Sequence, residues 1–311
     1  MCTMISRMRI GIDLGGTKIE LIALEDAGAE CLRLRRPTPA GDYAATLALM
    51  GDMVAQAERE TGVQATVGIG TPGAIAENSG RMQNCNSTCL NGKLLQQDME
   101  AMLCREVRLA NDANCFALSE AVDGAGKEAE IVFGVILGTG VGAGIVVQGS
   151  PLAGANGISG EWGHNPLPGP RDDERPGPPC YCGRHGCVEA WLSGPAMAAD
   201  HMRLNGGALT AKDIAERAAA GDMACGATLA RYTERLARAL AGVINILDPQ
   251  MIVLGGGLSH ITSLYADVPL LWREHVFSDT VTTRLLPPVH GDSSGVRGAA
   301  WLWENQAWES Q

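Results

Sequence analysis

The chain has 311 residues, of which 46% are hydrophobic and 19% charged, so it is long enough and apolar enough for two folded domains. Its net charge of −11 excludes a broad basic face, and we expect no nucleic-acid partner. An anionic small ligand would have to be held by local backbone amides and a metal ion.

Ten cysteines are spread along the chain, and only three of them lie close together in the sequence. Scattered cysteines in a long chain are typical of a reducing compartment, so we expect a cytoplasmic protein without a disulfide framework. The first ten residues include arginines but lack the apolar core of a signal peptide, and no stretch predicts a membrane span.

The first half of the chain predicts both strands and helices. Residues 9–14 and 19–24 have the pattern of strands joined by a short turn, which predicts a hairpin. Residues 43–60 carry apolar side chains at helical spacing, with Asp42 as N-cap and Gly62 as the end of the helix. The other elements predicted here are strands at 67–70 and 107–110 and a helix at 113–122.

The second half repeats the opening plan of strand, Gly/Thr turn and strand, over residues 131–147. This similarity predicts an internally duplicated architecture. The later elements predicted are a helix at 210–220 with Thr210 and Asp213 as a capping box, a helix at 224–247 ended by Asp248-Pro249, a strand at 251–254 and a final helix at 295–303. Charges and glycines at 119–130 predict a domain boundary there.

Three Gly-rich turns follow predicted strands. They are Asp13-Leu14-Gly15-Gly16-Thr17-Lys18, Gly138-Thr139-Gly140 and Gly255-Gly256-Gly257. Glycine lets backbone N–H groups approach phosphate oxygens, and Asp13 is a suitable ligand for a Mg²⁺ shell. One such turn could be a hairpin turn and nothing more, whereas three favour phosphate binding. A P-loop is absent, and a Rossmann dinucleotide site fits poorly because the first turn leads into a strand.

A candidate general base stands at the junction of a predicted strand and helix, in Asn111-Asp112. Asp112 could accept a proton from a substrate hydroxyl, with Asn111 orienting the substrate. The alternative is that either residue only caps the following helix. Position alone does not separate these two readings.

A cysteine-rich knot follows near the middle of the chain. Cys180, Cys182 and Cys187, with His164 upstream, form a set of three thiols and one imidazole that suits tetrahedral zinc. A redox pair or three buried apolar cysteines are the alternatives, and the glycines within the knot argue against plain burial. Residues 165–179 are rich in proline and charge, which predicts a long surface loop that the metal would tether.

Together these segments resemble the ROK family of sugar kinases within the actin-like ATPase superfamily. The pair Glu161-Trp162-Gly163-His164 and Cys180 to Glu189 carries most of the resemblance, and the matching pieces follow the family's order. The resemblance implies an α/β fold of two ribonuclease-H-like domains around a cleft, with a zinc-stapled loop. We expect residues 1–120, completed by a C-terminal helix at about 293–311, to form one domain, and residues 121–292 the larger one.

The resemblance also implies roles for individual residues. ATP and Mg²⁺ are expected at the Gly-rich turns, and structural Zn²⁺ at the knot, where His164 is both a ligand and a sugar contact. Asp112 is implied as the general base. The hexose contacts implied are Asn86, Asn111, Asp112, Glu161, His164 and Glu189. ROK kinases are often dimers, so a homodimer is expected.

The segments 84–92, 161–168 and 290–303 look most like bacterial fructokinases of the mannofructokinase type, which implies phosphorylation of D-fructose at its 6-hydroxyl, with mannose weaker. Cys89 departs from the bulky aromatic residue expected there. The alternatives are a ROK kinase for N-acetylglucosamine, N-acetylmannosamine or glucose, and a ROK regulator that binds sugar without turnover. Only twelve residues precede Asp13, too few for the DNA-binding domain of such a regulator.

Overall fold

The computed structural model describes residues 8–76 and 78–303. Its first sheet has the strand order β3-β2-β1-β4-β7. β1 (Arg9–Leu14) pairs antiparallel with β2 (Lys18–Leu24) and parallel with β4 (Thr66–Thr71). β7 (Val107–Asn111) continues the parallel side, and β3 (Glu30–Pro37) forms the opposite edge. The hairpin predicted at the start of the chain is therefore present.

The second sheet repeats this topology in the order β10-β9-β8-β11-β12. β8 (Ile131–Leu137) pairs antiparallel with β9 (Val141–Val147) and parallel with β11 (Met251–Gly255). The edges are β10 (Ser150–Pro151) and β12 (Arg284–Leu286). The internal duplication predicted from the sequence is thus a property of the fold.

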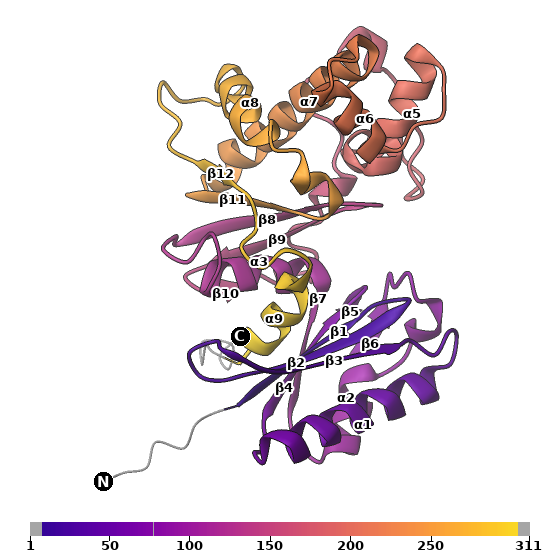
Figure 1. Cartoon of the computed structure of the whole chain (residues 1–311), viewed down its shortest axis with the longest axis vertical. Coiled ribbons are helices and arrows are strands. Elements are labelled where there is room, and N and C mark those ends of the chain that lie inside the picture. The colour runs from indigo at the N-terminus through magenta and orange to yellow at the C-terminus, as the bar shows by residue number, and fades with distance from the viewer. Residues whose placement is uncertain (1–7, 77, 304–311) are drawn as a thin grey trace.

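Two buried helices lie between the sheets, as Figure 1 shows. α3 (Asp112–Val122) packs on β8 and β9, while α9 (Ser294–Trp301) packs on β1 and β4 and against α3. At the crossing, a Cβ on Gly298 would lie 1.6 Å from the carbonyl oxygen of Cys115, so only glycine permits this approach. α3 and α9 therefore form one packed layer between the two sheets.

The remaining helices cover the ends of the molecule (Figure 1). α1 (Tyr43–Thr61) and α2 (Leu95–Leu103) lie at one end, and α4 (Glu189–Leu192), α5 (Gly194–Asn205), α6 (Ala211–Ala219), α7 (Met223–Leu247) and α8 (Leu264–Leu271) at the other. The small β5 (Ala74–Ala76) and β6 (Arg81–Gln83) form a separate pair. Short 3-10 turns are η1 (Thr88–Leu90), η2 (Trp162–His164), η3 (Asp172–Glu174), η4 (Gly257–His260), η5 (Trp272–Glu274) and η6 (Gly291–Ser293).

Local capping agrees with the sequence where the signals were strong. The Asp42 side chain accepts from the N–H of Ala45 at the start of α1, and Gly62 ends that helix with φ 71°. Thr210 and Asp213 form the predicted capping box of α6. Several elements were not predicted: β3, β5, β6, α2, α5, α8 and β12.

The predicted domain boundary after residue 120 falls in the last turn of α3 and stays a prediction. The predicted final helix ends at Trp301, and residues 304–311 of the predicted C-terminal segment lie outside the described residues. Within the part of the chain that is described, no helix combines the length and apolarity that crossing a bilayer requires.

Candidate functional site

The candidate base lies where β7, an edge strand of the first sheet, leads into α3. Asn111 ends β7, and its side-chain oxygen accepts from the N–H of Asn114 at 2.7 Å, so Asn111 is the N-cap of α3. Asp112 is the first helical residue, and its carboxylate accepts only locally, from the N–H of Ala113 at 2.8 Å. The capping role therefore belongs to Asn111, which leaves Asp112 available for chemistry.

The pKa of the Asp112 carboxyl is raised, because the surrounding protein disfavours its charge and the carboxylate of Glu161 lies nearby. The residue is nevertheless accessible to solvent. Asp13, at the end of β1, is a close acidic neighbour. Burial, then the charges of Asp112 and Glu20, raise the pKa of Asp13 to about 6. Two acids at the ends of adjacent elements thus share one region of negative potential.

The first Gly-rich turn closes the β1–β2 hairpin. Gly15 donates its N–H to the carbonyl of Lys18 at 3.0 Å, and the Lys18 ammonium lies 3.1 Å from the carboxylate of Glu20. A Cβ on Gly16 would lie 3.3 Å from the hydroxyl of Ser87. The predicted phosphate turn is therefore adjacent to the loop that carries the exposed Asn86, one of the predicted sugar contacts.

The other two Gly-rich turns meet at a cavity of about 910 Å³. Gly138, Thr139 and Gly257 line it, together with the first turns of α5 and α6. Gly255 and Gly256 are glycines for packing reasons: a Cβ would meet the ring of Phe116 in the first case and the backbone of Leu137 in the second. The nucleotide-binding prediction at the third turn therefore rests on Gly257. Nothing in the sequence indicated that α5 and α6 would line this cavity.

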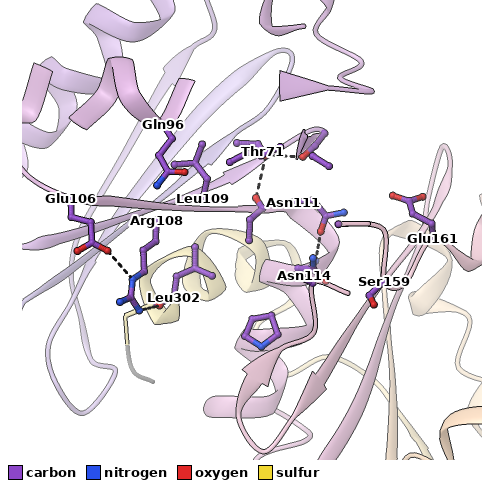
Figure 2. A pocket seen from close by; sticks show the side chains of 17 residues that line it. Thr71, Gln96, Glu106, Arg108, Leu109, Asn111, Asn114, Ser159, Glu161 and Leu302 are labelled. Atoms are coloured by element: carbon purple, nitrogen blue, oxygen red, sulfur yellow. Dashed lines mark hydrogen bonds and ion pairs between the residues drawn. The ribbon is translucent and has the colours of Figure 1, made fainter. Parts of the chain in front are cut away.

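A second cavity, of about 240 Å³, lies between the first sheet and the loop that follows β10 (Figure 2). Asn111 and Asn114 face Ser159 and Glu161 across it. Its other end is closed by Arg108, which pairs with Glu106 and donates to the carbonyl of Leu302. Small residues complete the wall: Gly73, Ala74, Ala110, Ala153 and Gly157. The sequence predicted Asn111 and Glu161 at the site but gave no sign of the small residues.

The knot brings its four predicted ligands together. The donor atoms of His164, Cys180, Cys182 and Cys187 all lie within 4.8 Å of one another. The sulfurs of Cys182 and Cys187 are 3.6 Å apart, and His164 Nδ1 is 3.6 Å from the sulfur of Cys180. Tetrahedral zinc with bonds of about 2.3 Å to sulfur requires donors about 3.8 Å apart, so these residues fit a structural zinc ion whose four positions are all filled by protein.

Both nitrogens of His164 have neighbours. Nδ1 faces the thiol of Cys180, while Nε2 forms a 2.9 Å hydrogen bond with the hydroxyl of Tyr181. The Tyr181 ring stands edge-on to the imidazole, with ring centres 5.0 Å apart. A sugar contact from His164 would therefore have to displace Tyr181, a residue that the sequence did not single out.

Glu189 connects the knot to the large cavity. It begins α4, directly after the buried Cys187-Val188 pair, and its Oε2 accepts from the N–H of Val141 at 2.9 Å. Val141 follows the Gly138–Gly140 turn. One carboxylate oxygen of Glu189, a predicted sugar contact, is thus bound to a backbone amide next to the predicted nucleotide turn.

These features define a protein of two duplicated α/β halves, with one cavity lined by Asn111, the neighbour of Asp112, and another between two Gly-rich turns. The chain belongs to the ROK family, whose model matches residues 9–306. An N-acetyl-D-glucosamine kinase of Yersinia pseudotuberculosis serotype O:3 (strain YPIII) is 40% identical over 95% of this chain and 98% of its own length. One from Pectobacterium atrosepticum is 38% identical over 95% of this chain and 98% of its own.

Solved structures agree with this fold. The ROK hexokinase from Thermus thermophilus has a TM-score of 0.86 and 28% identity, covering 97% of this chain and 100% of that one. A ROK glucokinase from Streptomyces griseus, in complex with glucose and AMPPNP, has a TM-score of 0.75 and 25% identity, covering 94% and 98%. The actin-like α/β fold expected from the resemblance is confirmed.

We predict one zinc per chain, lost in the variant Cys182→Ser. A serine oxygen is a poor substitute for a thiolate, so the knot should open and the melting temperature should fall. Elemental analysis and thermal melts check this. Cys225→Ser, a buried cysteine outside the knot, is the control and should keep its zinc. Full zinc retention in Cys182→Ser would contradict the ligand set.

We predict that Asp13→Asn stabilises the ligand-free protein at pH 8. The pKa of Asp13 is raised to about 6 in the folded state, so the charged carboxylate destabilises the fold. This destabilisation is absent at low pH, where Asp13 is neutral, and develops as the pH rises through that value. The gain should be up to about 3 kcal/mol at pH 8 and should shrink towards zero near pH 4.

Melts from pH 4 to 8 measure this dependence on pH. Asp52→Asn, on the exposed side of α1, is the control for losing one charge. A gain in Asp13→Asn that does not change with pH would show that burial does not raise this pKa.

Proposed function

We propose that this protein is an ATP-dependent kinase that phosphorylates N-acetyl-D-glucosamine at its 6-hydroxyl, with Asp112 as the general base. The relatives and solved structures named above support the broader part of this proposal, that the protein is a sugar kinase of the ROK family. The choice of an N-acetyl sugar is supported by two relatives at 38–40% identity and by the cavity beside Asn111.

The chemistry assigned to Asp112 is proton acceptance. The sugar hydroxyl oxygen attacks the γ-phosphorus of ATP, the bond to the β-phosphate oxygen breaks, ADP leaves, and the hydroxyl proton passes to the carboxylate. A carboxyl with a raised pKa suits this task because it holds the proton better than an ordinary aspartate. Bound Mg²⁺ would supply neutralisation of phosphate charge, and Asp13 is the residue placed to hold its shell.

The observation that carries the N-acetyl assignment is the cavity of about 240 Å³. It opens beside the predicted sugar contacts Asn111 and Glu161, and Ala74, Ala110 and Ala153 give it an apolar wall. An acetamido substituent needs such room and such a wall, whereas fructose has no group to fill it. Fructose, which the sequence segments suggested, therefore has less support than the N-acetyl alternative.

A regulator that binds sugar without turnover is the second class of function. It would bind a hexose but release no ADP, so a coupled assay with N-acetylglucosamine, glucose, mannose and fructose separates the two classes. Highest kcat/KM for N-acetylglucosamine is the expected result. A homodimer and the absence of a nucleic-acid partner stay predictions of the sequence.

We predict that Asp112→Asn lowers kcat at least about a hundredfold with little change in sugar affinity, because an amide keeps the shape but cannot accept the proton. Turnover and calorimetric sugar binding are measured together. Asp222→Asn, which removes an acid at the N-terminus of α7, is the control and should keep its turnover. Turnover within a few fold of wild type in Asp112→Asn would make that residue structural.

We predict that Ala74→Leu raises KM for N-acetylglucosamine about tenfold, about 1.4 kcal/mol, and changes KM for glucose much less, because the added side chain fills the cavity. Ala76→Leu is the matched control, since Ala76 lies in the same strand but does not line the cavity. An equal rise for both sugars would place the acetamido group elsewhere.

A further inference from the structure

Glu189 needs support from outside its own helix. α4 is only four residues long, so it cannot fix the direction of a side chain by its own hydrogen bonds. The Glu189 carboxylate nevertheless reaches Val141 at 2.9 Å, and a Cβ on Gly140 would lie 2.7 Å from the same oxygen. Something must hold α4 closely enough to keep this contact.

That support comes from α7. The guanidinium carbon of Arg235 lies 4.3 Å from the centre of the Trp191 ring, in α4. One turn away on α7, the buried Tyr232 donates its hydroxyl hydrogen to the carbonyl of Leu192 at 3.0 Å. A guanidinium over an indole face is attracted by the ring's negative face, most strongly in a desolvated site. Two residues of α7 therefore hold two consecutive residues of α4.

Arg235 is itself fixed by two buried acids. Its Nε donates to Glu174 at 2.8 Å and its Nη1 lies 3.3 Å from Asp200, and its side chain is only 4% exposed. Glu174 belongs to the proline-rich loop between His164 and Cys180, so the same arginine contacts both that loop and the helix after the knot.

Arg235 is the leading cationic influence on both acids, but each acid also pairs with a second arginine. Glu174 also accepts from Arg238 at 2.8 Å, and Asp200 accepts from Arg231 at 2.9 Å. Burial alone would raise the pKa of each carboxyl, but the arginines lower it below its ordinary value. What Arg235 adds beyond its charge is geometry: a planar, two-sided group between the acids and the Trp191 ring.

We propose that Arg235 is a positioning residue for Glu189, acting through Trp191. It holds α4 so that Oε2 of Glu189 accepts from the N–H of Val141, next to the predicted nucleotide turn, which fixes the direction of the whole carboxylate. The expected effect on sugar binding rests on the proposed function, whereas the expected effect on the hydrogen bond of the Val141 amide does not.

The experiment compares Arg235→Lys with Arg231→Lys in the zinc-loaded protein. Lysine keeps the charge opposite the acids but loses the planar face that stacks on Trp191. Arg231 is the matched control because it lies one turn earlier on α7 and pairs with the same Asp200.

In Arg235→Lys we expect the amide hydrogen of Val141 to exchange with solvent about ten times faster. This exchange is measured by mass spectrometry of a peptide that covers residues 138–144. KM for the best hexose should rise about tenfold, while KM for ATP changes less than twofold. Arg231→Lys should match wild type in all three. If Arg235→Lys melts far below wild type, Trp191→Phe provides the second test, with the same direction and a smaller change.

Three outcomes overturn the proposal: unchanged exchange at Val141 in Arg235→Lys, equal changes in Arg231→Lys, or equal rises in KM for sugar and ATP, which would indicate a general loss of structure. If wild type phosphorylates no hexose, the proposed function fails, and the exchange measurement still decides the positioning role of Arg235.

Discussion

The close crossing of α3 and α9 is the contact on which the rest of the molecule depends. Gly298 allows the backbones to touch at Cys115, and both helices are buried almost throughout between the two sheets. The far end of α3 is fixed as well, because the fully buried Glu120 carboxylate accepts from the hydroxyl of Ser294 at 2.8 Å and from the N–H of Val289 at 3.1 Å. A carboxylate buried in this way is stable only while these donors stay in place.

This crossing determines where Asp112 can stand. Asp112 begins the same helix whose middle touches α9 and whose last turn carries Glu120, so its carboxylate is placed by a rigid, doubly anchored element rather than by a loop. The helix dipole favours a negative charge at this end, while burial and Glu161 oppose it. Burial is the larger of these opposing effects, so the pKa of Asp112 is raised and the carboxylate holds a proton better than an ordinary aspartate.

How far the sequence predicted this structure depends on the range of the interactions involved. The first hairpin and the helices with caps at Asp42 and Thr210 were predictable, because their signals lie within a few residues. β3 was missed because its arginines interrupt the apolar pattern of a strand, and nothing local indicates that Arg33 and Arg35 pair with the buried Glu20 of β2. α5 was missed because it begins with Gly194-Pro195, which has the composition of a loop although proline suits a first helical turn.

The site shows the same division. The convergence of His164 and the three cysteines of the knot was predictable because thiol spacing is itself a chemical signal. The cavity on which the proposed N-acetyl specificity rests was not predictable, because it is made of small residues such as Ala74 and Ala153, which meet only in the folded chain. Pairing of Glu174 with Arg235 joins residues that lie 61 positions apart, and nothing in a proline-rich loop indicates such a partner.

The knot region is therefore held in two physically different ways. A bound metal would fix His164 and the three cysteines to one another, but it would not fix the loop between them, which is long and lacks a strand. The buried Arg238 does this by donating to the carbonyls of Pro168 and Gly169 while also binding Glu174. Because carbonyls and a carboxylate converge on one guanidinium, the loop is attached to α7 by geometry that a point charge could not reproduce. A site that must present several acids and amides to one sugar needs this rigidity, since a displacement of about 1 Å in any of them can cost about a hundredfold in rate.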